Sequence, residues 1–378
     1  MSSTSQFDQI TDRNNLNSDK WAKYPEDVIP MWVADMDFDS PMCVKQALQE
    51  RVSKGVFGYT FAPKSLIEAI QTHCQTHYDW LPNGAHLVHL PGLVCALHLS
   101  VRTFSEPGER IIVPAPVYYH LTRAAEISDR VLETIPFEVK ENRWTIDIES
   151  MAQACAKPDA KMILLCNPHN PGGTVYTRNE LEAIHALAKQ HDLIVVSDEI
   201  HCDLILSQSK HIPFASLNED AAQRSITLMA PSKTYNIAGL GYAFAVIPNS
   251  ALRKQFSSAR GAIVPAPNLL ALVAAEAAYR DGEPWRKELV NYLSANRDYI
   301  QQRIAGTPLQ LVGMEATYLA WIDASGLGLY DPYQYFLDRG VGLSPGKDFG
   351  HGQFVRLNFG CPRAQLEKAL DRMLVDLY

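Results

Sequence analysis

Three polar residues, Asn170, Asp198 and Lys233, each follow a short run of apolar residues. The preceding runs are residues 162–166, 193–197 and 226–229. Runs of this length and composition predict buried strands of a parallel sheet. Ligands of such sheets bind at the carboxyl ends of the strands, so we expect the three side chains to converge on one site.

The three residue types suit one kind of chemistry. A lysine amine can form a Schiff base with an aldehyde cofactor, and a carboxylate can keep a pyridine nitrogen protonated. The protonated ring withdraws electrons from a substrate carbon that loses a proton, and an asparagine amide can donate to the phenolic oxygen of the ring. Lys233, Asp198 and Asn170 therefore predict a pyridoxal phosphate site.

Longer stretches of the sequence resemble one protein family. Residues 167–173, 197–201 and 232–240 are similar to those of fold-type I pyridoxal phosphate enzymes. Within that superfamily, the chain resembles the MalY/PatB branch of cystathionine β-lyases, also called C–S lyases. The likeness continues in residues 30–38, 58–60, 317–321 and 356–363. These blocks extend over nearly the whole chain.

The resemblance implies an α/β protein with the fold-type I transferase fold, in which helices flank a mostly parallel central sheet and a smaller α/β domain is added. The chain of 378 residues also exceeds the usual size of one hydrophobic core, which predicts two domains. Apolar runs alternate with helical stretches, as in a parallel sheet covered on both sides. Strands are expected at residues 87–90, 110–113, 132–137, 162–166, 193–197, 226–229 and 243–247.

The domain limits follow from these elements. We expect residues 1–45 to join the small domain, residues 46–284 to form the large cofactor-binding domain and residues 285–378 to form the small C-terminal domain. A proline-containing stretch at 281–284 is the expected hinge. Apolar residues at helical spacing predict amphipathic helices over residues 180–191 and 363–378.

The phosphate group is expected at Gly92, Leu93 and Val94, where a helix would begin directly after a strand. A helix N-terminus offers free amides and the positive end of a dipole to an anion. Ser232 could add a hydroxyl. The resemblance also implies that Tyr59 reaches the phosphate from the neighbouring subunit, which predicts a homodimer with a shared active site.

Two further residues are expected at the cofactor ring. By its position in the family, Tyr118 matches the tyrosine that stacks on the ring, and an aromatic face suits a flat cationic ring. The neighbouring Tyr119 remains an alternative. His201 stands where aspartate aminotransferases carry a tyrosine that binds the ring oxygen, and a histidine buried at a strand end is the other interpretation.

The amino-acid end of the substrate has its own expected residues. Arg356 is expected to bind the substrate carboxylate through two parallel hydrogen bonds, because a guanidinium matches the geometry of a carboxylate. The resemblance adds a backbone contact near Ala34, and Asn170 completes this set.

The resemblance implies α,β-elimination on L-cysteine S-conjugates, giving a thiol, pyruvate and ammonia. Lys233 would act as the general base, with Asp198 and Tyr118 at the cofactor ring. An aminotransferase using the same site is the alternative, and a regulatory binding protein that retains the cofactor is a second one. Gly241 occupies the position of a phosphate-binding arginine in aspartate aminotransferases, which favours elimination.

Composition and charge argue against several other classes of protein. The net charge of −8 argues against nucleic acid as a partner. The N-terminus has no apolar core typical of a signal peptide, and the apolar run at 269–279 is too short to cross a membrane. Seven cysteines without a C-x-x-C pair indicate reduced thiols and a cytoplasmic protein. His73 and His77 are interpreted as surface histidines, and no metal site is expected.

Overall fold

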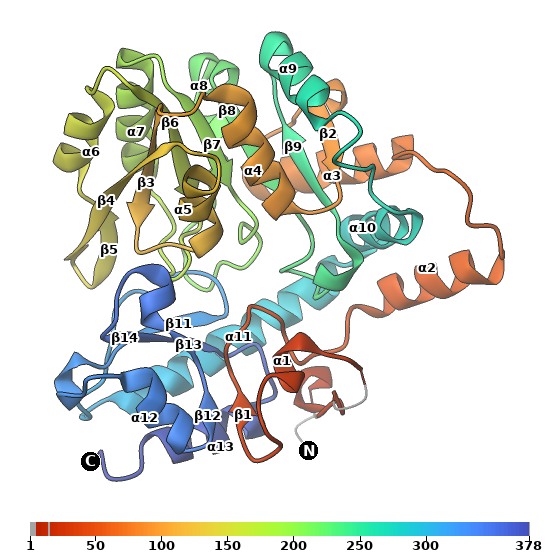
Figure 1. Cartoon of the computed structure of the whole chain (residues 1–378). Coiled ribbons are helices and arrows are strands. Elements are labelled where there is room, and N and C mark those ends of the chain that lie inside the picture. The colour runs from red at the N-terminus through yellow and green to blue at the C-terminus, as the bar shows by residue number, and fades with distance from the viewer. Residues whose placement is uncertain (1–4, 14–15, 378) are drawn as a thin grey trace.

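An eight-stranded sheet lies at the centre of the larger part of the molecule (Figure 1). The computed structural model describes residues 5–13 and 16–377. In spatial order the strands are β2 (Leu87–Leu90), β9 (Ala243–Val246), β8 (Ser225–Met229), β7 (Ile194–Asp198), β6 (Ala160–Cys166), β3 (Arg110–Ala115), β4 (Val131–Lys140) and β5 (Arg143–Ile146). Each predicted strand is present, and the prediction of an α/β fold with a mostly parallel sheet is confirmed.

Helices cover both faces of this sheet because successive residues of each strand point to opposite sides. Along β6, Leu164 packs in the cluster with α4, α5 and α9, whereas Leu165 packs in the cluster with α6, α7 and α8. A third cluster joins α3 and α10 to β9. The helices are α2 (Met42–Ser53), α3 (Lys64–Tyr78), α4 (Leu93–Phe104), α5 (Tyr119–Glu126), α6 (Ile148–Cys155), α7 (Arg178–Gln190), α8 (Glu219–Gln223), α9 (Ser250–Arg260) and α10 (Leu269–Asp281).

The three strands that precede Asn170, Asp198 and Lys233 are adjacent and parallel. β6 pairs with β7, and β7 pairs with β8, both in parallel register. Their carboxyl ends therefore meet at one edge, as predicted. Two strands depart from the parallel pattern: β9 runs antiparallel to β2 and β8, and β5 forms a hairpin with β4.

A smaller sheet belongs to the C-terminal part of the chain. Its strands, in spatial order, are β10 (Gln310–Leu311), β11 (Leu319–Asp323), β14 (Phe354–Asn358) and β13 (Ser344–Pro345). The helices of this region are α11 (Glu283–Ile304), α12 (Pro332–Asp338) and α13 (Arg363–Met373). The predicted helix over 363–378 ends at Met373, because Asp376 has a φ of 62°, which a right-handed helix does not allow.

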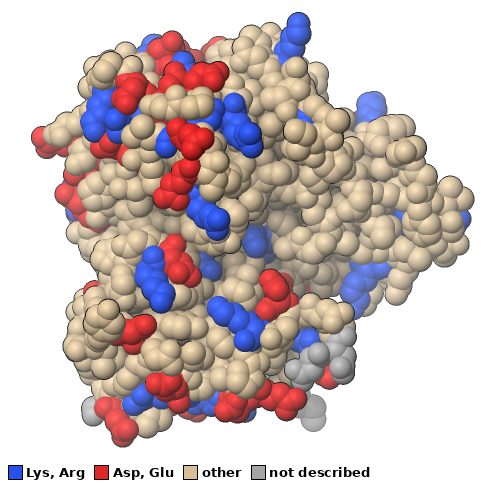
Figure 2. Space-filling view, viewed as in Figure 1, with Lys and Arg blue, Asp and Glu red and all other residues tan. Residues whose placement is uncertain are grey.

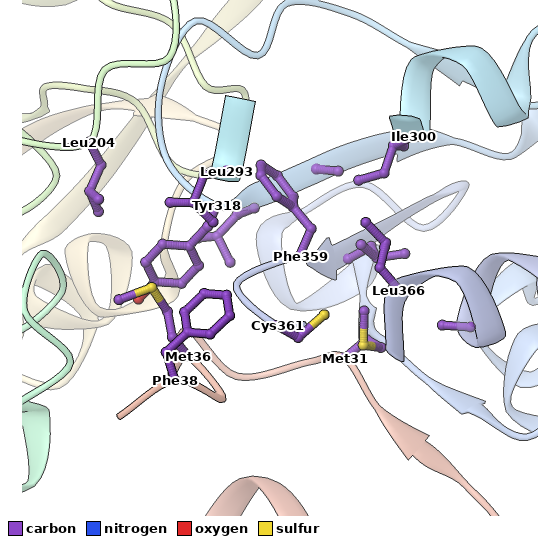
Figure 3. Packing of buried hydrophobic residues seen from close by; sticks show 14 of the residues in the cluster. Met31, Met36, Phe38, Leu204, Leu293, Ile300, Tyr318, Phe359, Cys361 and Leu366 are labelled. Carbon is purple, nitrogen blue, oxygen red and sulfur yellow. The ribbon is translucent and has the colours of Figure 1, made fainter. Parts of the chain in front are cut away.

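The N-terminal segment packs against this smaller part. β1 (Ile29–Pro30) pairs with β12 (Val341–Gly342), and α1 (Asp19–Ala22) supplies Lys20, whose buried amine lies 2.7 Å from Asp37. Figure 3 shows Met36 and Phe38 next to Tyr318, in one apolar cluster with residues of α11 and α13. These contacts support our proposed division into residues 1–45, 46–284 and 285–378.

The proposed hinge lies where α10 and α11 meet. Gly282 separates the two helices, and a Cβ added there would lie 2.4 Å from the carbonyl oxygen of Ala278. The Tyr235 ring, 2.6 Å from the same Cβ, also leaves no room, so this junction requires a residue without a side chain. None of the helices in the described ranges is long and apolar enough to cross a bilayer.

Candidate active site

A cavity of about 600 Å³ opens at the carboxyl ends of β6, β7 and β8. Figure 2 shows the surface hollowed between the upper and lower parts of the molecule. The lining contains predicted site residues from both parts of the chain: Ala34, Gly92, Leu93, Val94, Tyr118, Asn170, Asp198, His201, Ser232, Lys233 and Arg356. Of the predicted site residues, Tyr59 is the one that the described chain does not bring to this cavity.

The Lys233 side chain points toward the N-terminal segment. Its amine donates a hydrogen bond of 2.7 Å to the carbonyl oxygen of Ala34. Burial lowers the pKa of Lys233 to about 8, and the carboxylates of Asp35 and Asp198 only partly oppose this effect. An amine with a lowered pKa is more readily unprotonated, which is the form that attacks an aldehyde or accepts a proton.

Asp198 ends β7 and is buried at the floor of the cavity. Burial raises its pKa to about 7, and the charge of Glu199 acts in the same direction. The Ile200 amide donates 3.1 Å to one carboxylate oxygen and stabilises the ionised form. A protonated ring nitrogen at this carboxylate would favour the ionised form much more strongly, because two opposite charges would then meet in a buried place.

His201 is buried beside the cavity in its neutral form. Burial lowers its pKa to about 3, and the cations of Lys233 and Arg356 lower it further. Its Nδ1 atom has no hydrogen-bond partner in the described chain. A buried polar atom without a partner is rare in folded proteins, so His201 has unused hydrogen-bonding capacity at the cavity wall.

Arg356 lies in β14 at the small-domain wall of the cavity. Its guanidinium donates 3.0 Å to Asn170 Oδ1, 3.1 Å to the Trp32 carbonyl and 3.2 Å to Ser344 Oγ. Its Nε atom is buried and lacks a partner. Burial lowers the pKa of Arg356 to about 10, so a carboxylate ligand would relieve both the desolvated charge and the unpaired donor.

The first turn of α4 borders the opposite end of the cavity. A Cβ added to Gly92 would meet no atom within 4 Å, so this position opens onto empty space beside the helix N-terminus. Gly241 approaches the same loop closely: its φ is 68°, and an added Cβ would lie 2.8 Å from the Pro91 carbonyl oxygen. Local packing thus explains why residue 241 is a glycine. The absence of an arginine at this position is therefore only weak support for elimination over transamination.

Tyr118 and Tyr119 both line the cavity, but they are not equivalent. Tyr118 is half-buried, and burial raises the pKa of its hydroxyl, with the charge of Asp198 acting in the same direction. Tyr119 is 38% exposed, and the two ring centroids are 4.9 Å apart. Burial and the proximity to Asp198 favour Tyr118 as the ring-stacking residue.

Behind the cavity wall lies a buried polar network that the sequence interpretation missed. Asp203 contacts His73 Nε2 at 2.7 Å and Thr234 Oγ1 at 3.3 Å, and the Tyr78 hydroxyl donates to it as well. Because Thr234 follows Lys233, the network fixes the loop that carries the lysine. The interpretation of His73 as a surface residue is wrong, since the Asp203 carboxylate stabilises it in the interior.

Four cavity residues came from stretches without a recognisable strand-end signal. Trp32, Ser344, Asp348 and Phe349 all belong to the N-terminal segment or the small domain. The block at residues 30–38 could have indicated Trp32. Nothing in the sequence around Asp348 distinguishes it from an ordinary surface acid, because it reaches the cavity only through the packing of the two domains.

Tyr59 lies outside the cavity in a segment without helix or strand. Its side chain is fully exposed, at 112% of the reference area. Its neighbours Val56, Phe57 and Phe61 are also exposed, as is Ile263 from another loop. In Figure 1 this segment is the long connection between α2 and α3 at the outer edge of the molecule.

The arrangement fits a pyridoxal phosphate molecule. One end of the cavity offers helix amides and the Ser232 hydroxyl, and its floor offers a buried carboxylate. Lys233 and His201 line the same cavity. The fold and the cavity therefore define a fold-type I protein with the donor groups of a pyridoxal phosphate site.

Comparison with known proteins agrees with this class. The family model described as Aminotransferase class I and II matches residues 26–373, and the chain belongs to this family. It is 39% identical to cystathionine β-lyase PatB of Bacillus subtilis (strain 168), over 97% of this chain and 98% of that protein. The predicted resemblance to the MalY/PatB branch is thus confirmed.

Solved structures extend the similarity to three dimensions. The crystal structure of OvoB has a TM-score of 0.96 and 47% identity, covering 98% of both chains. The PLP-bound C–S lyase from Staphylococcus hominis has a TM-score of 0.93 and 30% identity, covering 100% of this chain and 99% of that one.

Proposed function

We propose that this protein is a pyridoxal phosphate-dependent C–S lyase that performs α,β-elimination on L-cysteine S-conjugates. The observation that carries the proposal is the convergence of the Lys233 amine, the Asp198 carboxylate and the Arg356 guanidinium on one cavity. The similarity to a cystathionine β-lyase and to a PLP-bound C–S lyase supports it.

Each residue has a distinct role in this reaction. Bound pyridoxal phosphate supplies an aldehyde for the substrate amine and a ring that withdraws electrons from the substrate Cα. Arg356 binds the substrate carboxylate through its guanidinium, which lines the cavity. Asp198 would hold the cofactor's ring nitrogen in its protonated form, and His201, whose pKa burial lowers, would contact the cofactor without adding a charge.

Lys233 moves the proton that starts the elimination. With the substrate amino acid bound in the cavity, the Nζ of Lys233 would take the proton from the substrate Cα. The Cβ–S bond then breaks, and the sulfur leaves with the bonding electron pair and is protonated to a thiol. The released enamine reacts with one water to give pyruvate and ammonia, so no oxidant, reductant or keto acid is consumed.

A product assay on the purified, cofactor-loaded protein tests this function. We expect pyruvate and thiol in equal amounts over many turnovers from L-cystathionine or a similar thioether, without an added keto acid. Turnover that requires a keto acid and yields no thiol would identify an aminotransferase instead. A protein that binds the cofactor but forms neither product would fit a regulatory role.

We further propose that two chains share each site through Tyr59. Val56, Phe57, Tyr59 and Phe61 expose apolar side chains within one short segment, and proteins usually bury such exposed apolar area at interfaces. The Tyr59 hydroxyl would then reach the phosphate group bound by the partner chain. We also expect a cytoplasmic location, in keeping with the seven unpaired cysteines of the chain.

A further inference from the structure

One charged residue of the cavity has no role in the proposed reaction. The charged side chains in the lining are Lys233, Asp198, Arg356 and Asp348. The first three are assigned to the cofactor and to the substrate carboxylate. Asp348 lies in a short 3₁₀ helix, η6 (Gly346–Phe349), and its side chain is exposed. Its carboxylate forms no hydrogen bond or ion pair with any other residue that the structure describes.

Asp348 lies close to the residue that would bind the substrate carboxylate. The ring of the adjacent Phe349 is 4.6 Å from the guanidinium carbon of Arg356. The negative charge of Asp348 raises the pKa of the Arg356 guanidinium and so opposes the larger, lowering effect of burial. A substrate held by Arg356 therefore has an unpaired carboxylate in the same wall of the cavity.

A second cavity of about 480 Å³ is also lined by Asp348 and Phe349, which thus form the boundary between the two. Its other walls include Phe137 and Trp144 from the β4–β5 hairpin and Glu126 from α5. A substituent that extends from the substrate sulfur toward this space must pass the Asp348 carboxylate.

We propose that Asp348 selects cysteine S-conjugates whose sulfur substituent carries a cationic nitrogen. A carboxylate without a protein partner attracts an ammonium group and can accept a charge-assisted hydrogen bond from it. The same carboxylate repels a second carboxylate, so the two effects add in the discrimination between cationic and anionic substituents. This inference rests on the proposed elimination, because it assumes that a substrate amino acid occupies the cavity with its carboxylate at Arg356.

Three conjugates of matched length test the selection: S-(2-aminoethyl)-, S-propyl- and S-carboxymethyl-L-cysteine. The three thiols differ as leaving groups, so kcat/KM values are not compared directly between conjugates. For each conjugate, kcat/KM of Asp348→Asn is divided by kcat/KM of the wild type, which cancels this difference. We expect the cationic-to-anionic preference to fall by about tenfold in the variant. The propyl conjugate measures any effect that is common to all three.

The neighbouring Lys347 provides the control. It is exposed and lines the second cavity but not the first. Lys347→Gln changes the net charge by the same amount as Asp348→Asn, in the opposite sense. If Asp348 acted only through its long-range charge, Lys347→Gln would change the cationic-to-anionic preference by the same factor in the opposite direction. If Asp348 contacts the substituent, Lys347→Gln changes this preference much less.

Binding of amino acids that lack sulfur separates this inference from the function on which it rests. L-lysine, L-2-aminoheptanoate and L-2-aminoadipate match the three conjugates in length, and calorimetry gives their dissociation constants with the cofactor-loaded protein. We expect the wild type to prefer lysine over aminoadipate and Asp348→Asn to lose this preference. If this result is obtained while no conjugate yields pyruvate, the proposed lyase function is wrong and the role of Asp348 stands. If all conjugates yield pyruvate and Asp348→Asn affects them equally, Asp348 does not select the substituent.

Discussion

The cavity at the ends of β6, β7 and β8 and the segment of residues 55–63 are built in opposite ways. In the cavity, the functional groups are buried and oriented by partners from the same chain: Lys233 by Ala34, and Arg356 by three acceptors. In the segment, Tyr59 and its apolar neighbours have no regular structure around them and are exposed. One chain therefore preorganises the groups of the cavity, whereas the proposed role of Tyr59 requires a second chain to cover the exposed segment.

The two regions also differ in when their side chains are removed from water. Orientation of Arg356 and Asp198 takes place during folding of the single chain, and the desolvation of their charges is already complete before a ligand binds. Ligand binding then relieves unfavourable burial rather than creating it. In the exposed segment the apolar side chains remain in water, and the partner chain that we propose would remove this unfavourable exposure.

The largest effect is expected for the residue at the centre of the cavity. Lys233→Ala should lower kcat for pyruvate formation at least about 10³-fold, because the general base and the covalent attachment are both lost. The exposed Lys254 on α9 provides the control, and Lys254→Ala should retain full activity. Reduction of the cofactor-loaded wild type with borohydride and peptide mapping should label Lys233. A label on a different lysine would contradict the assignment.

A conservative change tests the preorganised cavity more finely. Arg356→Lys keeps the positive charge but removes the planar fork, so kcat/KM should fall about 100-fold, mainly through a higher KM. Ser344→Ala removes one acceptor of the guanidinium and should change KM only a few-fold. Steady-state kinetics on one conjugate measures both. Equal effects of the two changes would mean that Arg356 is structural.

A negative charge placed at Tyr59 tests the proposed role of the exposed segment. Tyr59→Asp would place a carboxylate beside the phosphate group and should weaken cofactor binding about tenfold or more. Tyr330 is also fully exposed, and Tyr330→Asp should have no such effect. Mixing Tyr59→Asp chains with Lys233→Ala chains should restore about a quarter of the wild-type activity, because each hybrid dimer contains one intact site. Hybrids that form and remain inactive would refute the shared site.

The smallest effect concerns stability without the cofactor. Because burial raises the pKa of Asp198 to about 7 from 3.8, the folded state binds more protons than the unfolded state within this window. The stability contributed by this group therefore falls as the pH rises from 3.8 to about 7. Asp198→Asn should stabilise the cofactor-free protein at about pH 8 by on the order of 1–3 kcal/mol, with little change near pH 4. Urea unfolding measures this difference, and a variant that is less stable at about pH 8 would contradict it.

The strand-end residues were predictable because their signals are local. Asn170, Asp198 and Lys233 each follow an apolar run, and the predicted runs correspond to β6, β7 and β8. The helix N-terminus at Gly92 was likewise indicated by a glycine between a strand and an apolar stretch. Their convergence required only the rule that parallel strands present their carboxyl ends at one edge.

The buried network and the small-domain wall were not predictable in this way. His73 was interpreted as a surface residue, since the Asp203 carboxylate that stabilises it belongs to a distant loop. Asp348 reaches the cavity only because the small domain packs over the strand ends. No local pattern encodes which polar side chains meet across such a contact.

The sequence by itself thus determined the order of strands and helices, the edge at which the cofactor groups converge and the family to which the chain belongs. These properties depend on apolar periodicity and on short motifs, which act over a few residues. Only the tertiary structure decided which charges are buried, which donors lack a partner and which carboxylate lines the cavity without a protein partner. Those properties depend on desolvation and pairing between segments far apart in the chain, and they exist only once the two domains are packed together.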